Sequence, residues 1–184
     1  MPFVKKKKII SFRKQFKLRK FTHNNKITQP MTQLKEGMKA PPFEGIDQNG
    51  KVVKLSDFSG KKVVLYFYPK DDTPGCTAEA CNLRDNYNAL LKKGFAIVGV
   101  SMDSEKSHKN FAAKYSLPFP LLADTSKKIL NDYGVWREKS LYGKTFLGIV
   151  RTTFIIDEKG VIEKVISKVD TKSHTEQIFK IYQQ

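Results

Sequence analysis

The sequence has little cysteine, no long apolar run and, over its first 30 residues, no acid. Its 184 residues include two cysteines, Cys76 and Cys81. That number is too small for the disulfide framework of a small secreted domain, so we expect a reducing, cytoplasmic setting. The longest apolar stretches, residues 63–68 and 95–100, are far shorter than the ~18 residues of a membrane span. We therefore expect a soluble chain without a membrane span.

The net charge of +16 is unevenly distributed. Residues 1–30 hold ten Lys or Arg and no acid, whereas the rest has 24 basic against 18 acidic residues. This balance disfavours a nucleic-acid-binding face on the body. The basic segment lacks the apolar core and cleavage site of a secretory signal peptide. It fits a transit peptide, a membrane-surface arm, a nucleic-acid tail, or a misassigned start upstream of Met31. We expect a disordered or misassigned extension at 1–30 and one domain at 34–184.

Past residue 36 the pattern is that of an alternating α/β domain. Residues 63–68 form a β-branched and aromatic run ending at Pro69, which predicts a central strand covered on both faces. A strand at 95–101 and a helix at 104–115 continue the pattern and predict parallel pairing. The other expected elements are a hairpin of 43–46 and 51–55, a short helix at 126–133, a hairpin of 146–156 and 161–166, and a C-terminal helix at 171–182.

Cys76 lies near the start of a predicted helix. Thr73 is a capping residue and Pro74 suits the first helical position, so we expect a helix from there to about Lys93. Cys76 would lie in the first turn, where unpaired backbone N–H groups and the helix dipole stabilise a thiolate. The position suits a nucleophile. The alternative is a buried cysteine that packs as a small hydrophobe.

The neighbourhood of Cys76 carries a family resemblance. Proline, threonine and cysteine at positions 69, 73 and 76 resemble the peroxiredoxin active-site pattern PxxxTxxC. Cys81 and the segment at 134–140 narrow the resemblance to the bacterioferritin-comigratory-protein or peroxiredoxin Q subfamily. The similarity runs from about residue 34 to the C-terminus and includes 148–157. It implies an α/β, thioredoxin-like fold, in which helices flank a central mixed β-sheet with an added N-terminal β-hairpin.

The resemblance also implies a function and a set of site residues. Cys76 would be the peroxidatic nucleophile that forms a sulfenic acid, and Cys81 the resolving cysteine that forms an intramolecular disulfide with it. Thr73 would position the peroxide or donate to the thiolate, Pro69 would shield the site, and Arg151 would stabilise developing charge. The implied partners are a hydroperoxide substrate and thioredoxin or a similar dithiol reductant. The family requires no cofactor or metal, and its members of this type are often monomers.

Each of these residues also has a structural interpretation. Thr73 could be a plain helix cap, Pro69 a strand terminator, and Arg151 a surface residue of the strand at 146–156. An arginine in that otherwise apolar strand needs an anionic partner if it is buried, which favours the catalytic role. Cys81 lies about 140° from Cys76 around the predicted helix, on its polar face, so packing explains it poorly. An incidental surface cysteine is the alternative.

Three other classes of function compete with a peroxidase. A thioredoxin-like disulfide reductase should carry Cys-x-x-Cys, whereas this chain has four residues between its cysteines. A metal site is weaker still, because His23, His108 and His174 are scattered and are expected at the surface. A nucleic-acid or acidic-surface binding protein would rest on the basic tail, with the enzyme core vestigial.

Overall fold

A five-stranded sheet organises the chain. The structure is a computed structural model that describes residues 34–141 and 143–183, so the extension predicted at 1–30 lies outside the described residues. The strand order is β5-β4-β3-β8-β9, with β3, β4 and β5 parallel and the other neighbours antiparallel. The strands are β3 (Lys62–Phe67), β4 (Phe95–Ser101), β5 (Leu121–Ala123), β8 (Thr152–Ile156) and β9 (Ile162–Ile166). The central mixed sheet predicted from the sequence is confirmed.

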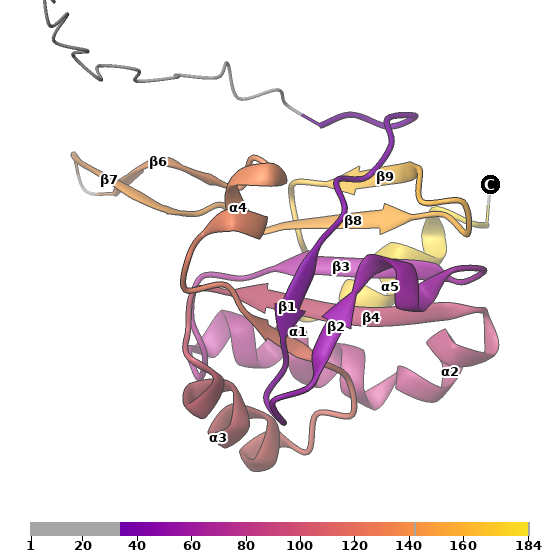
Figure 1. The fold of residues 1–184 in the computed structure, drawn as a ribbon, viewed down its shortest axis with the longest axis horizontal. Helices are drawn as coiled ribbons and strands as arrows, with labels where there is room; N and C mark the ends of the chain where they lie inside the picture. Colours follow the sequence, from indigo (N-terminus) through magenta and orange to yellow (C-terminus); the bar gives the residue numbers. More distant parts are fainter. Residues whose placement is uncertain (1–33, 142, 184) are drawn as a thin grey trace, which may run out of the picture. The chain divides into compact units, whose positions relative to one another are not determined.

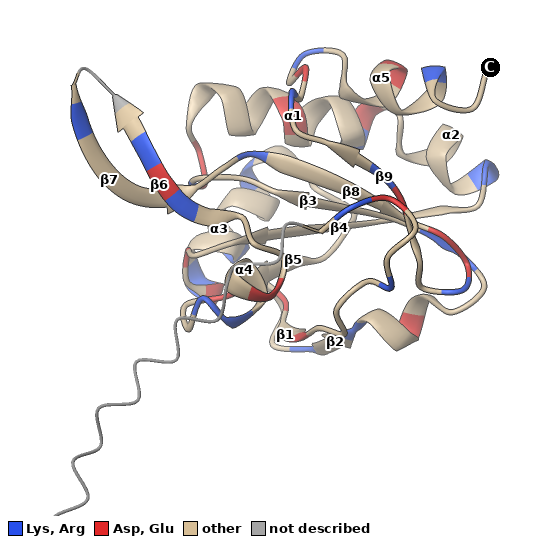
Figure 2. Cartoon of the chain, turned by 90° about the horizontal axis from the view of Figure 1, so that it is seen from above, with Lys and Arg blue, Asp and Glu red and all other residues tan. Residues whose placement is uncertain are grey.

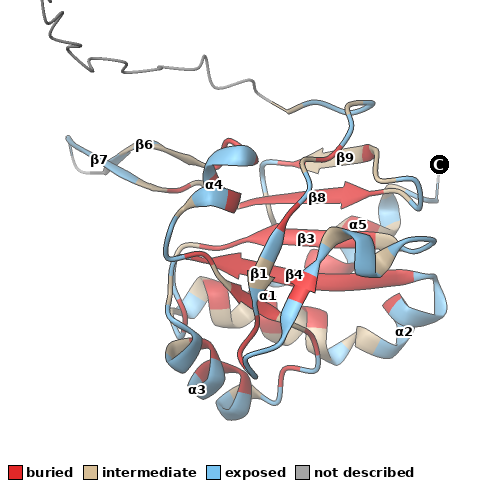
Figure 3. Cartoon of the chain, in the orientation of Figure 1, coloured by how far each residue is buried: buried red, intermediate tan, exposed pale blue. Residues whose placement is uncertain are grey.

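Both faces of the sheet are covered, as the apolar run at 63–68 predicts (Figures 1 and 3). Alternate residues of β3 point to opposite sides: Val63 and Leu65 join one buried cluster, Val64 and Tyr66 the other. The first cluster includes residues of the β1–β2 hairpin region and α4, and the second includes residues of α1, α2, α3 and α5. These elements are β1 (Glu44–Ile46), β2 (Val52–Lys54), η1 (Leu55–Phe58), α1 (Pro74–Asp85), α2 (Tyr87–Lys92), α3 (Glu105–Tyr115), α4 (Lys128–Asp132) and α5 (His174–Lys180).

Two predicted elements are each divided in two. The helix expected from Pro74 to about Lys93 is α1 followed by α2, with a break at Asn86, whose side chain donates to the carbonyl of Asn82 at 2.9 Å. The strand expected at 146–156 is β7 (Lys144–Ile149) followed by β8. β7 pairs with β6 (Trp136–Leu141) in a separate two-stranded sheet, which projects beside the central sheet (Figure 1).

The histidines correct another prediction. His108 and His174 are 0% exposed, whereas the sequence suggested surface positions, and His23 lies outside the described residues. Figure 2 shows basic and acidic residues spread over several elements of the described chain. None of the described helices is both long enough and apolar enough to span a membrane.

Candidate active site

The strand register brings two distant segments together. β3 and β8 are antiparallel, and Phe67 at the end of β3 pairs with Thr152 at the start of β8. β3 ends, and the chain continues toward α1, at the same end of the sheet where Arg151 precedes the start of β8. The link between β7 and β8 therefore places Arg151 beside the start of α1.

Cys76 lies in the first turn of α1 and is 2% exposed. Arg151 donates from Nη2 to the Cys76 sulfur at 3.1 Å. The side chain of Arg151 is 21% exposed, so its charge is only partly screened by water. The guanidinium and the free N–H groups of the first helical turn thus surround this sulfur with positively polarised donors.

Glu79 is a member of this site that the sequence reasoning missed. Its side chain is 0% exposed, and its Oε2 forms an ion pair with Nη1 of Arg151. Among the described residues, its Oε1 has no hydrogen-bond partner. Burial raises the pKa of Glu79 to about 7, although the charge of Arg151 opposes that rise. The sequence signal was available, because Glu79 falls three residues after Cys76 and therefore on the buried side of the helix.

His174 lies next to Glu79 and is a second buried residue of this site that the sequence reasoning missed. Its Nε2 lies 3.8 Å from Oε1 of Glu79 and 2.9 Å from the hydroxyl of Thr153, and its Nδ1 lies 3.1 Å from Oε1 of Gln177. Burial lowers the pKa of His174 to about 4, so the imidazole is neutral near pH 7. A row of polar contacts thus runs from Cys76 through Arg151 to Glu79 and ends at a neutral histidine.

Thr73 and Pro69 lie on the loop that leads into α1. Thr73 occupies the N-cap position, but its hydroxyl donates to the carbonyl of Lys70 at 3.0 Å rather than accepting from a helix N–H. A plain capping role therefore does not account for this side chain. Pro69 is half-buried directly after Tyr68, close to the end of β3.

Cys81 lies on α1, in the second half of the helix, and is half-buried. Cys76 and Cys81 are both free thiols. The neighbouring Asn82 ties α1 to the α5 region, because it donates to the carbonyl of Lys172 at 2.9 Å and accepts from the N–H of Thr175 at 2.8 Å. Cys81 therefore lies one residue before Asn82, whose hydrogen bonds attach α1 to the α5 region.

A buried thiol at a helix N-terminus lies against an arginine where two central strands of a mixed sheet end, an arrangement suited to a thiol-based redox enzyme. The chain belongs to the AhpC/TSA family, whose model matches residues 37–165. It is 48% identical over 145 residues to the putative peroxiredoxin bcp of Coxiella burnetii, which covers 79% of this chain and 96% of the relative. It is 40% identical over 183 residues to the chloroplastic peroxiredoxin Q of Sedum lineare, covering 94% of this chain and 96% of that one.

Solved structures give the same assignment. A structure of Xanthomonas campestris peroxiredoxin Q matches with a TM-score of 0.72 and 36% identity, over 77% of this chain and 89% of that one. The peroxidoxin BcpB of Mycobacterium tuberculosis matches with a TM-score of 0.72 and 33% identity, over 82% of this chain and 97% of that one. The chain is a peroxiredoxin of the Bcp and peroxiredoxin Q type, and hence a thiol peroxidase.

Proposed function

We propose that Cys76 is the peroxidatic nucleophile of this peroxidase. Its thiolate sulfur attacks one oxygen of a hydroperoxide, a sulfur–oxygen bond forms, and the oxygen–oxygen bond breaks. The leaving oxygen takes a proton and departs as water or an alcohol, while Cys76 becomes a sulfenic acid. The contact of 3.1 Å between Arg151 Nη2 and the sulfur is the observation that carries this proposal.

In the next step Cys81 resolves the sulfenic acid. The thiolate of Cys81 attacks the sulfur of Cys76, a disulfide forms, and the hydroxyl leaves as water. On a regular helix, Cα atoms five residues apart are about 8.6 Å apart, whereas a disulfide needs about 4.4–6.8 Å. Because both cysteines lie on α1, the helix has to unwind locally before the bond can close. A dithiol protein, which we propose is thioredoxin, then reduces the disulfide and is itself oxidised.

Three residues support the first step. Arg151 stabilises the thiolate and the negative charge that builds on the peroxide oxygens. Thr73 already donates its proton to Lys70, which leaves its oxygen free to accept a hydrogen bond from the hydroperoxide O–H. Pro69, half-buried after Tyr68, limits the access of water to the thiolate. The chain acts as a monomer in this proposal, because both redox cysteines lie on one helix.

The proposed substrates are hydrogen peroxide and organic hydroperoxides. The solved bacterioferritin comigratory protein of Xanthomonas campestris, 33% identical with a TM-score of 0.74, is described as having alkyl peroxide reduction activity. We extend that class of substrate to this chain and place the reaction in a reducing, cytoplasmic setting, where free thiols persist.

Consumption of hydrogen peroxide and cumene hydroperoxide by the purified full chain tests the proposal. With thioredoxin, its reductase and NADPH present, we expect multiple turnovers. Without them, we expect consumption to stop after about one equivalent, when the disulfide has formed. Absence of any consumption by the reduced protein contradicts the peroxidatic role of Cys76. Turnover with another dithiol but not with thioredoxin contradicts only the choice of reductant.

A further inference from the structure

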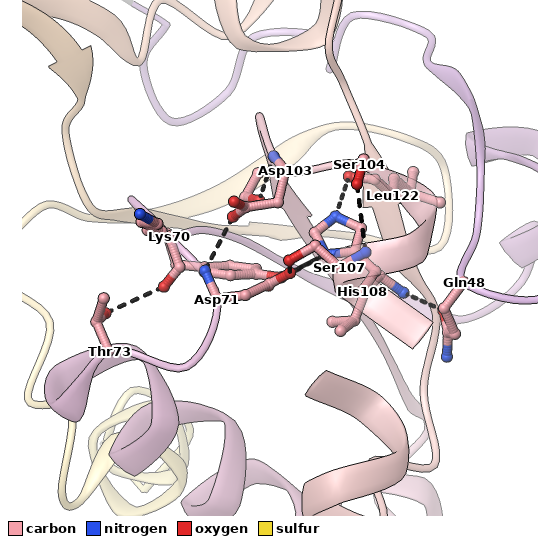
Figure 4. Close-up of polar contacts among 12 residues, drawn as sticks. Gln48, Lys70, Asp71, Thr73, Asp103, Ser104, Ser107, His108 and Leu122 are labelled. Carbon is pink, nitrogen blue, oxygen red and sulfur yellow. Dashed lines mark hydrogen bonds and ion pairs between the residues drawn. The ribbon is translucent and has the colours of Figure 1, made fainter. Parts of the chain in front are cut away.

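A buried polar cluster holds the loop between β3 and α1 in place (Figure 4). Asp71 is at its centre and is 7% exposed. Its Oδ1 accepts from the Tyr68 hydroxyl at 2.8 Å, and its Oδ2 accepts from the Ser107 hydroxyl at 2.7 Å. Its backbone N–H donates to Oδ2 of Asp103 at 2.9 Å. A loop residue bonded through its backbone and both carboxylate oxygens is held in one position.

His108 of α3 faces this carboxylate and is 0% exposed. Its Nδ1 lies 2.8 Å from Oδ2 of Asp71, and its Nε2 lies 3.2 Å from the carbonyl oxygen of Leu122. Each ring nitrogen of His108 therefore has a polar partner, one on the loop before α1 and one on β5. The imidazole thus links the loop that carries Asp71 to the central sheet.

Two further groups complete the cluster around this pair. Tyr68 reaches it from the end of β3, and burial raises the pKa of its phenol well above the ordinary value, so it is a neutral donor. Asp103, after β4, directs its Oδ2 at the N–H of Asp71 and at the hydroxyl of Ser101. The His108 ring is thus placed between Asp71 and a carbonyl, with Asp103 as the second nearby carboxylate.

The loop between β3 and α1, which this cluster holds in place, leads directly to the active site. Asp72 adopts a left-handed backbone with φ of 54°, and its carboxylate accepts from Lys114 and Tyr115 of α3 at 2.7 Å and 2.6 Å. This conformation is unfavourable for a residue other than glycine and persists where its surroundings enforce it. Thr73 follows and donates to Lys70, the residue before Asp71. The position of Asp71 therefore fixes the carbonyl that orients the Thr73 hydroxyl.

We propose that the buried pair of His108 and Asp71 is a positioning element of the peroxidase site, which holds Thr73 in the geometry that reaction of Cys76 with peroxide requires. The inference rests on the roles proposed above for Cys76 and Thr73. In the described part of the chain the Cys76 sulfur accepts a hydrogen bond from Arg151, and no hydrogen bond joins it to His108 or Asp71. Loss of the pair should therefore impair reaction with peroxide and leave the general reactivity of the thiolate intact.

Two rates measured on the same proteins test this division of roles. In a Cys81→Ser background, which leaves one reactive thiol, the reaction of Cys76 with hydrogen peroxide is followed by stopped flow, and its alkylation by iodoacetamide is followed by mass spectrometry. His108→Gln and Asp71→Asn should slow the peroxide reaction roughly tenfold or more, the scale of a small misplacement of a reacting group. Alkylation, which needs only the thiolate, should change less than about twofold.

A matched control separates positioning from general loss of stability. Ile162→Val changes a fully buried residue of β9 in the cluster on the other face of the sheet, and both rates should be unchanged. If His108→Gln does not fold, Ser107→Ala removes one bond to Asp71 and should still slow the peroxide reaction selectively.

The outcomes distinguish this inference from the proposed function. Equal slowing of both rates, or no slowing of the peroxide reaction in any of the variants His108→Gln, Asp71→Asn and Ser107→Ala, would overturn the positioning role. Failure of the unsubstituted site to react with peroxide, with alkylation intact, would instead overturn the function proposed for Cys76.

Discussion

Oε1 of Glu79 and Nε2 of His174 face each other at 3.8 Å, and both side chains are completely buried. Their pKa values are displaced in opposite senses, since burial raises that of Glu79 to about 7 and lowers that of His174 to about 4. Each group prefers its neutral form, as expected where water is excluded. Their contributions to the pH dependence of stability therefore oppose each other.

The single variants Glu79→Gln and His174→Gln should reveal those opposing contributions. Folded Glu79 retains a proton above its ordinary pKa of 4.5, so its contribution is complete below pH 4.5 and is lost as the pH rises through about 7. Folded His174 rejects a proton below its ordinary pKa of 6.5, so its contribution is complete above pH 6.5 and is lost as the pH falls through about 4. Each effect is on the order of 3 kcal/mol.

Urea unfolding between pH 4 and 7.5 measures this prediction. Glu79→Gln should make stability rise more steeply with pH, because the effect of His174 is no longer offset. His174→Gln should make stability fall with rising pH. Two variants with the same pH dependence as the unsubstituted chain would show that neither group titrates differently in the folded state.

Arg151→Met should slow the reaction of Cys76 with peroxide at pH 7 by roughly tenfold or more, the scale of a lost stabiliser of transition-state charge. Because the thiolate loses its cation, alkylation should also slow, in contrast to the variants of His108 and Asp71. Lys164→Met, which removes a cation from an exposed ion pair with Glu36, is the control and should leave both rates unchanged. An unaffected peroxide rate in Arg151→Met would reduce this residue to a structural role.

Arg151→Met should also destabilise the fold where Glu79 is ionised, because the carboxylate loses its ion-pair partner while it stays buried. The double variant Arg151→Met with Glu79→Gln should recover much of that stability, since no buried charge remains. A thermal unfolding comparison at pH 8 measures both. Equal stability of the single and double variants would indicate that the ion pair does not hold this part of the site.

Substitution of each cysteine should separate two chemical roles. Cys76→Ser should abolish peroxide reduction. Cys81→Ser should still consume about one equivalent of peroxide and accumulate a sulfenic acid that dimedone traps, but should lose most thioredoxin-supported turnover. Loss of the first equivalent in Cys81→Ser, with its retention in Cys76→Ser, would reverse the assignment.

Disulfide formation should loosen α1 and leave the sheet intact. After one equivalent of peroxide, amide exchange should accelerate across residues 75–84 and stay slow across 63–68 and 95–100. The bonds from Asn82 to the α5 region oppose this opening, so Asn82→Ala should enlarge the region of fast exchange. Equal protection of 75–84 in the reduced and oxidised forms would exclude the internal disulfide and point to an intermolecular partner for Cys76.

The sequence predicted what local patterns determine. The strand β3 and the start of α1 at Cys76 both follow from neighbouring residues. The charge of Arg151 in an apolar segment indicated that it needs an anionic partner. The sequence does not predict the break at Asn86, because apolar residues at helical spacing continue past it to the fully buried Leu90.

The buried histidines were assigned to the surface because their partners are remote in sequence. His108 bonds to Asp71, 37 residues away, and His174 contacts Thr153, 21 residues away. A polar residue is buried at low cost where such partners exist, and a single sequence does not reveal which distant segments will supply them. The division of the strand at 146–156 has the same origin, because only the pairing of β7 with β6 separates it from β8.

In the proposed redox cycle, the interruption at Asn86 limits how much of the molecule has to unfold. α1 is a twelve-residue unit, and α2 begins separately at Tyr87 with Leu90 completely buried. A helix that loses its first turns frays from the end, and the fraying has a boundary where the next segment is nucleated and packed on its own. The proposed disulfide would thereby unfold one small cooperative unit, so that repeated oxidation need not expose the chain to global unfolding or aggregation.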